Sequence, residues 1–158
     1  MIVAITREPA QSLGECELTY VGRQPIDTER AASQHGEYRR ALAACGARVV
    51  VLPAVEALPD SVFVEDTAVV LDELAVIARP GAESRRGETA SVAAALGEHR
   101  ELACIRAPGT LDGGDVLKIG DTVFVGRGGR TNDEGIRQLA AHLPGATVVP
   151  VPVTRVLH

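Results

Sequence analysis

A tandem repeat constrains the fold of this chain more than any other feature of its sequence. Two apolar runs rich in β-branched residues, Thr67–Leu71 and Leu74–Ala78, flank the turn Asp72–Glu73, and this pattern predicts a β-hairpin. The pattern returns at Asp115–Ile119 and Thr122–Val125, around a Gly-Asp turn 48 residues further along the chain. A fixed repeat distance of this size indicates that one supersecondary unit occurs twice in tandem.

A helix and a third strand follow each predicted hairpin. In the first copy, Ser84 is the expected N-cap of the helix, and Glu101–Arg106 is the closing strand. In the second copy, Thr131 and Glu134 form the expected capping box, and Ala146–Val153 is the closing strand. Each copy is therefore predicted to be a ββαβ module.

An incomplete copy of the module precedes these two ββαβ modules. Ile2–Thr6 predicts one strand, Asp27 caps a helix, and Arg48–Pro53 predicts the closing strand. The missing strand before this helix suggests a ring of modules closed by C-terminal residues, because radial repeats bury their edges only when the ring is complete. The predicted fold class is α/β, a single incomplete propeller domain over 1–158 with about three ββαβ modules, at about 1–53, 66–106 and 115–153. An ordinary α/β sandwich with repeated hairpins is the alternative.

Composition and motifs exclude several classes of partner. A net charge of −5, without a long basic run, argues against nucleic acid and anionic membrane. No apolar run approaches the length of a membrane span, and the N-terminus does not resemble a signal peptide. Because there is no CxxC pair, HExxH motif or P-loop, we expect no metal and no cofactor. The three widely spaced cysteines are predicted to be free thiols in a cytoplasmic protein.

Acidic residues gather in the two loops that enter the predicted hairpins. The first loop holds Asp60, Glu65 and Asp66, and adjacent carboxylates beside a buried strand are costly unless a cation meets them. A planar guanidinium with paired N–H donors suits such a fork. The second loop holds Asp112 and Asp115 around two glycines, which let the backbone approach a ligand closely. We therefore expect a shared central site, with a solvated strand entrance and ordinary turn chemistry as the alternatives.

Two arginines and a histidine complete the set of candidate site residues. Arg85 lies at the start of the second predicted helix, and Arg130 lies just before the third. Cations at helix starts oppose the helix dipole, so binding of an anion such as a ligand carboxylate is the more natural role. His158 follows a predicted strand, where an active-site general acid can stand; a disordered terminal residue is the alternative.

Taken together, these motifs resemble the dimethylarginine dimethylaminohydrolases, which form the guanidino-modifying superfamily with arginine deiminases and amidinotransferases. The resemblance covers nearly the whole chain. It rests on blocks that follow the family's order: Leu18 within Gly14–Thr19, Phe63–Thr67, Ala78–Arg86, Leu111–Val116, Gly129–Asn132 and Val156–His158. It implies the family's pentein-like propeller of five ββαβ modules, in agreement with the repeat.

The resemblance also implies substrate-binding roles. Asp66, with Glu65 beside it, matches the carboxylate that grips the substrate guanidinium. Asp60 and the backbone around Leu18 match positions that hold the amino-acid end of the substrate. The pair that binds the substrate carboxylate is matched by Arg85 and Arg130.

For the reaction, the resemblance implies covalent catalysis, with Asp112 as a second active-site acid and His158 as the catalytic histidine. A Cys thiolate attacks the guanidinium carbon of an Nω-methylated arginine. His158 protonates the departing amine and then activates water against the thiouronium intermediate. The products are citrulline and (di)methylamine, and no cofactor is required.

The resemblance implies that the nucleophilic cysteine lies in a C-terminal segment of the full-length protein, which we expect these 158 residues not to include. Cys45, on a helix face, and Cys104, within a strand, are expected to be buried and inert, and Cys16 is weakened as a nucleophile by the flanking carboxylates of Glu15 and Glu17. We therefore expect the isolated 158-residue chain to be inactive. An arginine deiminase or related guanidine hydrolase, or a non-catalytic fragment that binds cationic amino acids, is the alternative. The sequence leaves open whether the chain forms a homo-oligomer or associates with a complementing C-terminal segment.

Overall fold

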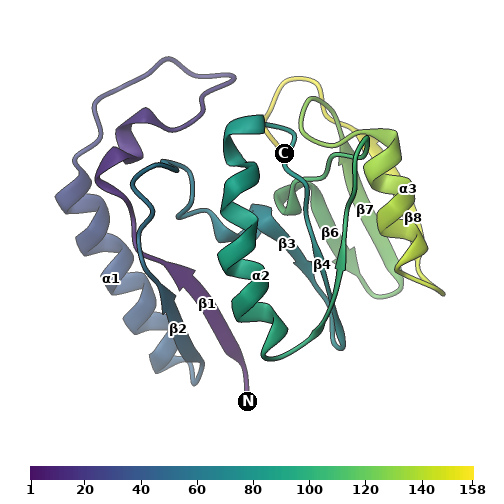
Figure 1. Cartoon of the computed structure of the whole chain (residues 1–158), viewed down its shortest axis with the longest axis horizontal. Coiled ribbons are helices and arrows are strands. Elements are labelled where there is room, and N and C mark those ends of the chain that lie inside the picture. The colour runs from purple at the N-terminus through teal and green to yellow at the C-terminus, as the bar shows by residue number, and fades with distance from the viewer. The chain divides into compact units, whose positions relative to one another are not determined.

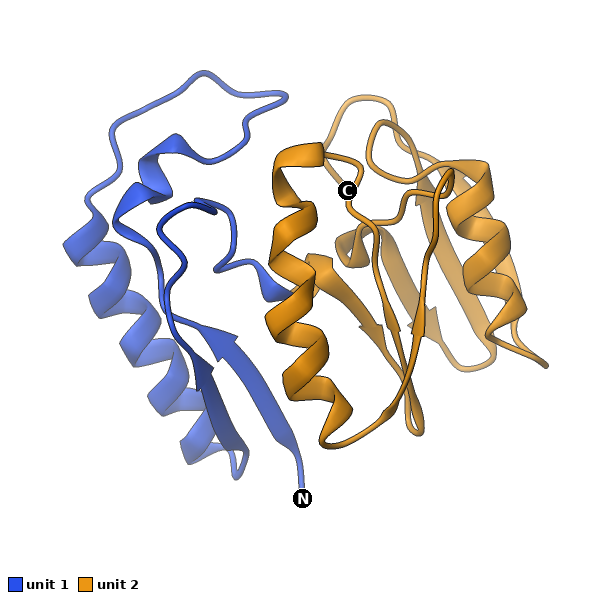
Figure 2. Ribbon diagram, in the orientation of Figure 1, with its two compact units in different colours: residues 1–64 blue, residues 65–158 orange.

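The computed structural model describes residues 1–158, which form two compact units, residues 1–64 and residues 65–158 (Figure 2). None of the helices has the length and apolar character needed to cross a membrane. The expectation of one incomplete domain over the whole chain stays a prediction.

The first unit is a βαβ arrangement. It contains β1 (Val3–Arg7), the 3₁₀ helix η1 (Gln11–Glu15), α1 (Thr28–Ala44) and β2 (Arg48–Leu52). β1 and β2 pair in parallel, and parallel neighbours need a crossover connection, which α1 provides alongside the two strands (Figure 1). Asp27 caps α1 as predicted, because its side chain accepts a hydrogen bond of 2.9 Å from the Arg30 backbone N–H.

The second unit contains the two predicted ββαβ modules. In the first, the 3₁₀ helix η2 (Val64–Thr67) leads into the antiparallel hairpin of β3 (Ala68–Val70) and β4 (Leu74–Ile77), and β5 (Glu101–Cys104) pairs in parallel with β4. In the second, η4 (Gly113–Asp115) leads into the hairpin of β6 (Val116–Ile119) and β7 (Thr122–Arg127), and β8 (Thr147–Pro152) pairs in parallel with β7. The repeat therefore gives two three-stranded sheets of the same topology.

The helices of the two modules begin differently from the prediction. The segment expected to start at Ser84 first forms the 3₁₀ helix η3 (Glu83–Glu88), whose N-cap position is Ala82, and α2 (Thr89–Gly97) follows. α3 (Asp133–Ala141) is capped by Asn132, whose side chain accepts a hydrogen bond of 2.8 Å from the Gly135 N–H. The capping box assigned to Thr131 is thus wrong, because the Thr131 hydroxyl bonds to Asp115 instead.

The apolar core of the second unit joins its two modules. The buried cluster comprises residues from both hairpins and from α3: Val69, Val76, Ile105, Leu111, Val123, Val125, Ile136, Leu139 and Leu143. Leu111 lies between the modules, where its backbone N–H donates a hydrogen bond of 2.9 Å to the Arg79 carbonyl. The shared core fixes the two modules against each other and thereby the loops at the starts of β3 and β6.

We predict that Leu111→Ala destabilises the protein by about 2–5 kcal/mol, because it removes a fully buried side chain and leaves a cavity. Urea unfolding followed by circular dichroism measures the change. Leu117→Ala is the matched control, since Leu117 is 58% exposed. Equal losses in both variants would contradict the assigned core.

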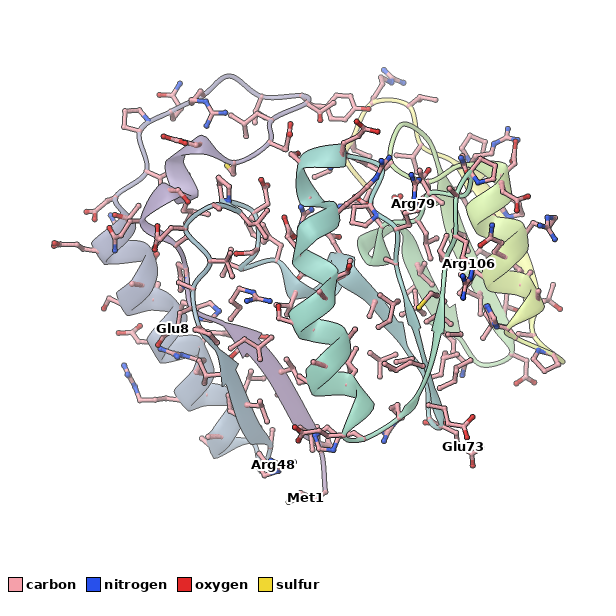
Figure 3. The ribbon with its side chains drawn as sticks, in the orientation of Figure 1. Met1, Glu8, Arg48, Glu73, Arg79 and Arg106 are labelled. Atoms are coloured by element: carbon pink, nitrogen blue, oxygen red, sulfur yellow. The ribbon has the colours of Figure 1, made fainter.

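The hairpin turns and the loops with the candidate site residues lie at opposite ends of the strands. Figure 3 shows Glu73 at the tip of the β3–β4 hairpin, whereas Arg79, just after β4, lies toward the other end. A surface groove of about 630 Å³ lies at the turn end and is lined in part by Leu71, Glu73, Leu74 and His142. It holds none of the predicted site residues.

Candidate active site

Asp66, in η2 just before β3, forms a buried ion-pair chain with η3. Its Oδ2 lies 2.7 Å from Arg85 Nη1. The Glu88 carboxylate accepts two further hydrogen bonds from Arg85, at 3.0 Å from Nε and 2.9 Å from Nη2. All three side chains are buried. Burial acts to lower the pKa of Arg85, but hydrogen bonds and charge attraction from Glu88 and Asp66 outweigh it, so its pKa is raised.

Arg85 therefore has protein partners that the sequence did not suggest. Its planar guanidinium lies between two carboxylates and orients Asp66. Its binding of a ligand carboxylate stays a prediction. The sequence analysis did not identify Glu88 as a site residue. Its spacing of three residues from Arg85, which places the two on one helical face, was the available signal.

Asp112, in the second loop, is fully buried and has one unpartnered oxygen. The Gly81 backbone N–H donates a hydrogen bond of 2.9 Å to its Oδ1. Its Oδ2 has no hydrogen-bond partner, and the nearest cation is Arg130 Nη1, which lies 3.7 Å away and is also buried without one. Burial raises the pKa of Asp112, and the nearby charge of Asp66 raises it further, whereas the Gly81 hydrogen bond and the cations Arg130 and Arg85 lower it. Unpartnered buried polar atoms of this kind are uncommon and often mark functional sites.

His158, which follows β8, lies between the two acidic loops. Its Nδ1 is 3.1 Å from Asp115 Oδ1, and its Nε2 is 3.4 Å from Asp66 Oδ1. The hydrogen bond with Asp115 raises the pKa of His158, burial lowers it, and the charges of Asp66, Asp115 and Asp112 raise it, with a net upward shift. Because the folded-state pKa exceeds the unfolded value, protonated His158 stabilises the fold at low pH, and this contribution is lost as the pH rises through the raised pKa.

Gly114 lets these groups come together. Its backbone N–H donates a hydrogen bond of 3.1 Å to Asp66 Oδ1. A Cβ at this position would lie 2.6 Å from Asp66 Oδ1 and 3.0 Å from His158 Nε2. The Gly-Gly pair is therefore required by close packing within the site.

One grouping has the spacing of a metal site. Asp66, Asp112 and His158 each offer one ligand atom, and these atoms lie within 4.8 Å of one another. Both carboxylates already face an arginine guanidinium, and the spacing suits a planar hydrogen-bonding cation as well as a metal ion. We assign no metal to this grouping.

The other predicted substrate-binding residues are Glu65 in the second unit and Asp60 and Leu18 in the first unit. Glu65 is exposed, and its side chain makes none of the contacts that join Asp66, Asp112 and His158. In the first unit, Asp60 is buried and accepts hydrogen bonds of 3.2 and 3.0 Å from the Glu17 N–H, next to the exposed Leu18. Asp60 thus holds the backbone that presents Leu18.

The burial predicted for two cysteines is wrong. Cys45 and Cys104 are exposed, whereas Cys16 is buried. Cys45 follows α1, a helix without a single fully buried residue, and Cys104 ends β5, an edge strand that pairs only with β4. No cysteine contacts His158, Asp66 or Asp112 through a hydrogen bond.

Comparison with known proteins places the chain in a family. Residues 21–156 match the profile of N,N dimethylarginine dimethylhydrolase, eukaryotic. The N(G),N(G)-dimethylarginine dimethylaminohydrolase of Streptomyces coelicolor is 51% identical over 161 residues, covering 98% of this chain and 61% of that protein. The Pseudomonas aeruginosa protein of the same name is 40% identical over 159 residues, covering 98% of this chain and 62% of its own length. This chain thus spans about three fifths of the length of these relatives.

Solved structures agree with the sequence relatives. A Cys-to-Ser mutant of the P. aeruginosa protein, complexed with citrulline, superposes with a TM-score of 0.93 at 40% identity, over 100% of this chain and 64% of that one. The N-terminal domain of ArgZ superposes with a TM-score of 0.86 at 21% identity, over 98% of this chain and 58% of that one, and supports the α/β pentein fold alone. The predicted α/β, pentein-like fold class is confirmed, and the chain belongs to the dimethylarginine dimethylaminohydrolase family of hydrolases.

Proposed function

We propose that this chain provides the substrate-binding acids and the acid–base histidine of an enzyme that converts Nω-methylated arginine to citrulline and (di)methylamine. The observation that carries the proposal is the convergence of Asp66, Asp112 and His158, from three separate loops, with ligand atoms within 4.8 Å of one another. Carboxylate oxygens at this spacing suit a planar cation with several N–H donors.

In this proposal, Asp66 and Asp112 accept hydrogen bonds from the substrate guanidinium. Asp66 is oriented by Arg85 and by the Gly114 N–H, so it does not have to reorganise when a ligand binds. The unpartnered Asp112 Oδ2 offers a second acceptor. Arg130 beside it, with Arg85, Asp60 and the Leu18 backbone, is assigned to the amino-acid end of the substrate, and Glu65 to the guanidinium end.

The chemistry follows from the placement of His158. A cysteine thiolate adds to the guanidinium carbon, and the tetrahedral adduct collapses as His158 passes a proton to the departing amine nitrogen. The resulting thiouronium then receives water, whose proton returns to His158. Breakage of the C–S bond releases citrulline and regenerates the thiolate. A raised pKa for His158 suits the first step, because it favours the protonated imidazole that can donate the proton.

We further propose that none of Cys16, Cys45 and Cys104 supplies this thiolate. All three are free thiols without a hydrogen bond to the histidine cluster, which fits a reducing, cytoplasmic setting. Residues 1–158 by themselves should therefore bind but not turn over a methylated arginine.

The test compares two polypeptides, residues 1–158 and the longest polypeptide that the gene encodes. With asymmetric dimethylarginine, the longer one should release citrulline and dimethylamine in equal amounts, and residues 1–158 should release neither. Faster turnover of arginine than of dimethylarginine would instead identify an arginine deiminase. Binding without turnover by both polypeptides would identify a module for cationic amino acids, and steady citrulline release by residues 1–158 would refute the proposal about the cysteines.

A further inference from the structure

Thr131 is fully buried and lies between the two ends of the second acidic loop. The Asp112 backbone N–H donates a hydrogen bond of 3.1 Å to its hydroxyl oxygen. The hydroxyl in turn donates one of 2.6 Å to Asp115 Oδ2. Because an amide N–H can only donate, the single hydroxyl proton is left for the Asp115 carboxylate.

The Asp115 carboxylate connects the Thr131 hydroxyl to His158. With Oδ2 occupied by the Thr131 hydroxyl, Oδ1 accepts the hydrogen bond from His158 Nδ1 at 3.1 Å. A proton on Nδ1 leaves Nε2 as the nitrogen that faces Asp66, 3.4 Å away. The series of hydrogen bonds that starts at Thr131 thus ends at His158 Nδ1, which lies closer to its carboxylate than Nε2 does to Asp66.

The backbone of β7 closes the other side of Asp115. A Cβ on Gly126 would lie 2.7 Å from Asp115 Oδ1 and 3.0 Å from Val153 Cγ2. The absence of a side chain on Gly126 therefore gives the carboxylate room to face His158.

Thr131 is not needed as a helix cap. Asn132 performs that function, since its side chain accepts hydrogen bonds from the Gly135 N–H at 2.8 Å and from the Thr110 N–H at 3.0 Å. The bonds of the Thr131 hydroxyl lead only into the acidic loop.

We propose that Thr131 is a positioning residue, which holds Asp115 so that His158 carries its proton on Nδ1 and presents Nε2 to the reacting groups. The catalytic part of this proposal rests on the proposed function, whereas the control of the histidine tautomer does not.

The carboxylates around His158 come from two loops. Asp66 lies before β3, Asp112 and Asp115 lie before β6, and the cations Arg85 and Arg130 face Asp66 and Asp112 respectively. The carboxylates of Asp66 and Asp112 are bonded to Arg85, Gly114 and Gly81, whereas the Asp115 carboxylate is bonded directly to the Thr131 hydroxyl. A changed His158 titration in the Thr131 variants is therefore expected to act mainly through Asp115.

The test is an NMR titration of the His158 imidazole nitrogens in ¹⁵N-labelled residues 1–158. The Thr131→Val variant keeps the shape of the side chain but loses the hydroxyl. It should lower the pKa of His158 relative to wild type and mix the two neutral tautomers. Thr131→Ala, which leaves room for water, should do the same, and Thr131→Ser should retain the wild-type titration.

A matched control is Asn132→Ala, which removes the helix cap next to Thr131. It should lower the stability by about 1 kcal/mol without changing the titration of His158. A wild-type pKa and tautomer in both Thr131→Val and Thr131→Ala would overturn the proposal, as would an equal shift in Asn132→Ala or in Thr131→Ser.

Kinetics of the longest polypeptide then separate this proposal from the proposed function. If both hold, Thr131→Val should lower kcat about ten-fold with little change in KM, a part of the roughly 10²–10⁴-fold that a positioned acid–base group contributes. If the Thr131→Val variant shifts the His158 titration but the wild type shows no turnover, the proposed function is contradicted and the control of the histidine tautomer by Thr131 is not. A wild-type kcat in Thr131→Val, despite a shifted titration, would overturn the catalytic part of the positioning role.

Discussion

Replacing His158 with alanine should lower kcat for asymmetric dimethylarginine by about 10²- to 10⁴-fold, the usual contribution of a positioned general acid–base. The loss follows from the position of Nε2, which faces Asp66 while Nδ1 is bonded to Asp115. Because the side chain is also 24% exposed, its removal leaves the core intact, and KM should change little. Steady-state citrulline release by the longest polypeptide measures both constants.

The pH profile gives this first prediction a second readout. The acidic neighbours raise the pKa of His158, so leaving-group protonation should persist at a pH above the ordinary histidine range and fall as the pH passes the raised pKa. His142→Ala is the control, since His142 lies at the C-terminus of α3, outside the site. If His158→Ala and His142→Ala give the same kcat, His158 is not the acid–base group.

Replacing Arg85 with methionine should destabilise the protein by about 3–5 kcal/mol, the largest change in stability expected at the site. Arg85 lies between two buried carboxylates, Asp66 and Glu88, and its removal takes away the cation that pairs with both. Removing one partner of a buried ion pair lowers the folding stability far more than removing one partner of an exposed pair. The reason is that water does not solvate the remaining buried charge. Chemical unfolding of residues 1–158 measures the loss.

Arg86→Met is the matched control for this second prediction. Arg86 is the next residue in η3, and its partner Glu83 is largely exposed, so the same substitution should change the stability by less than about 1 kcal/mol. Similar losses in the two variants would contradict the buried ion-pair chain.

The hairpins could be predicted from the sequence, whereas the partners of the site residues could not. Strand–turn–strand patterns at Thr67–Ala78 and Asp115–Val125 are local, so the alternation of apolar runs and turn residues sufficed to place β3, β4, β6 and β7. Glu88 and Thr131 gain their roles only from groups brought to them by the fold, Arg85 and Asp115. Thr131 was misassigned as a cap because Asn132, the next residue, has the same capping chemistry.

Burial was the other property that local sequence did not reveal. Cys45 and Cys104 have apolar neighbours along the chain, but α1 has no buried residue and β5 is an edge strand. Arg85 shows the reverse case, since a charged residue near a helix start lies buried between two protein carboxylates that its neighbours along the chain did not reveal.

The central claim is that the negative charge of Asp66 binds the methylated guanidinium, and Asp66→Asn tests it most directly. Asparagine has nearly the same shape and keeps one acceptor oxygen, but it carries no charge. A charge-assisted hydrogen bond contributes about 1.5–3 kcal/mol, so kcat/KM for asymmetric dimethylarginine should fall roughly 10- to 100-fold. An unchanged kcat/KM in a folded Asp66→Asn protein would contradict the account.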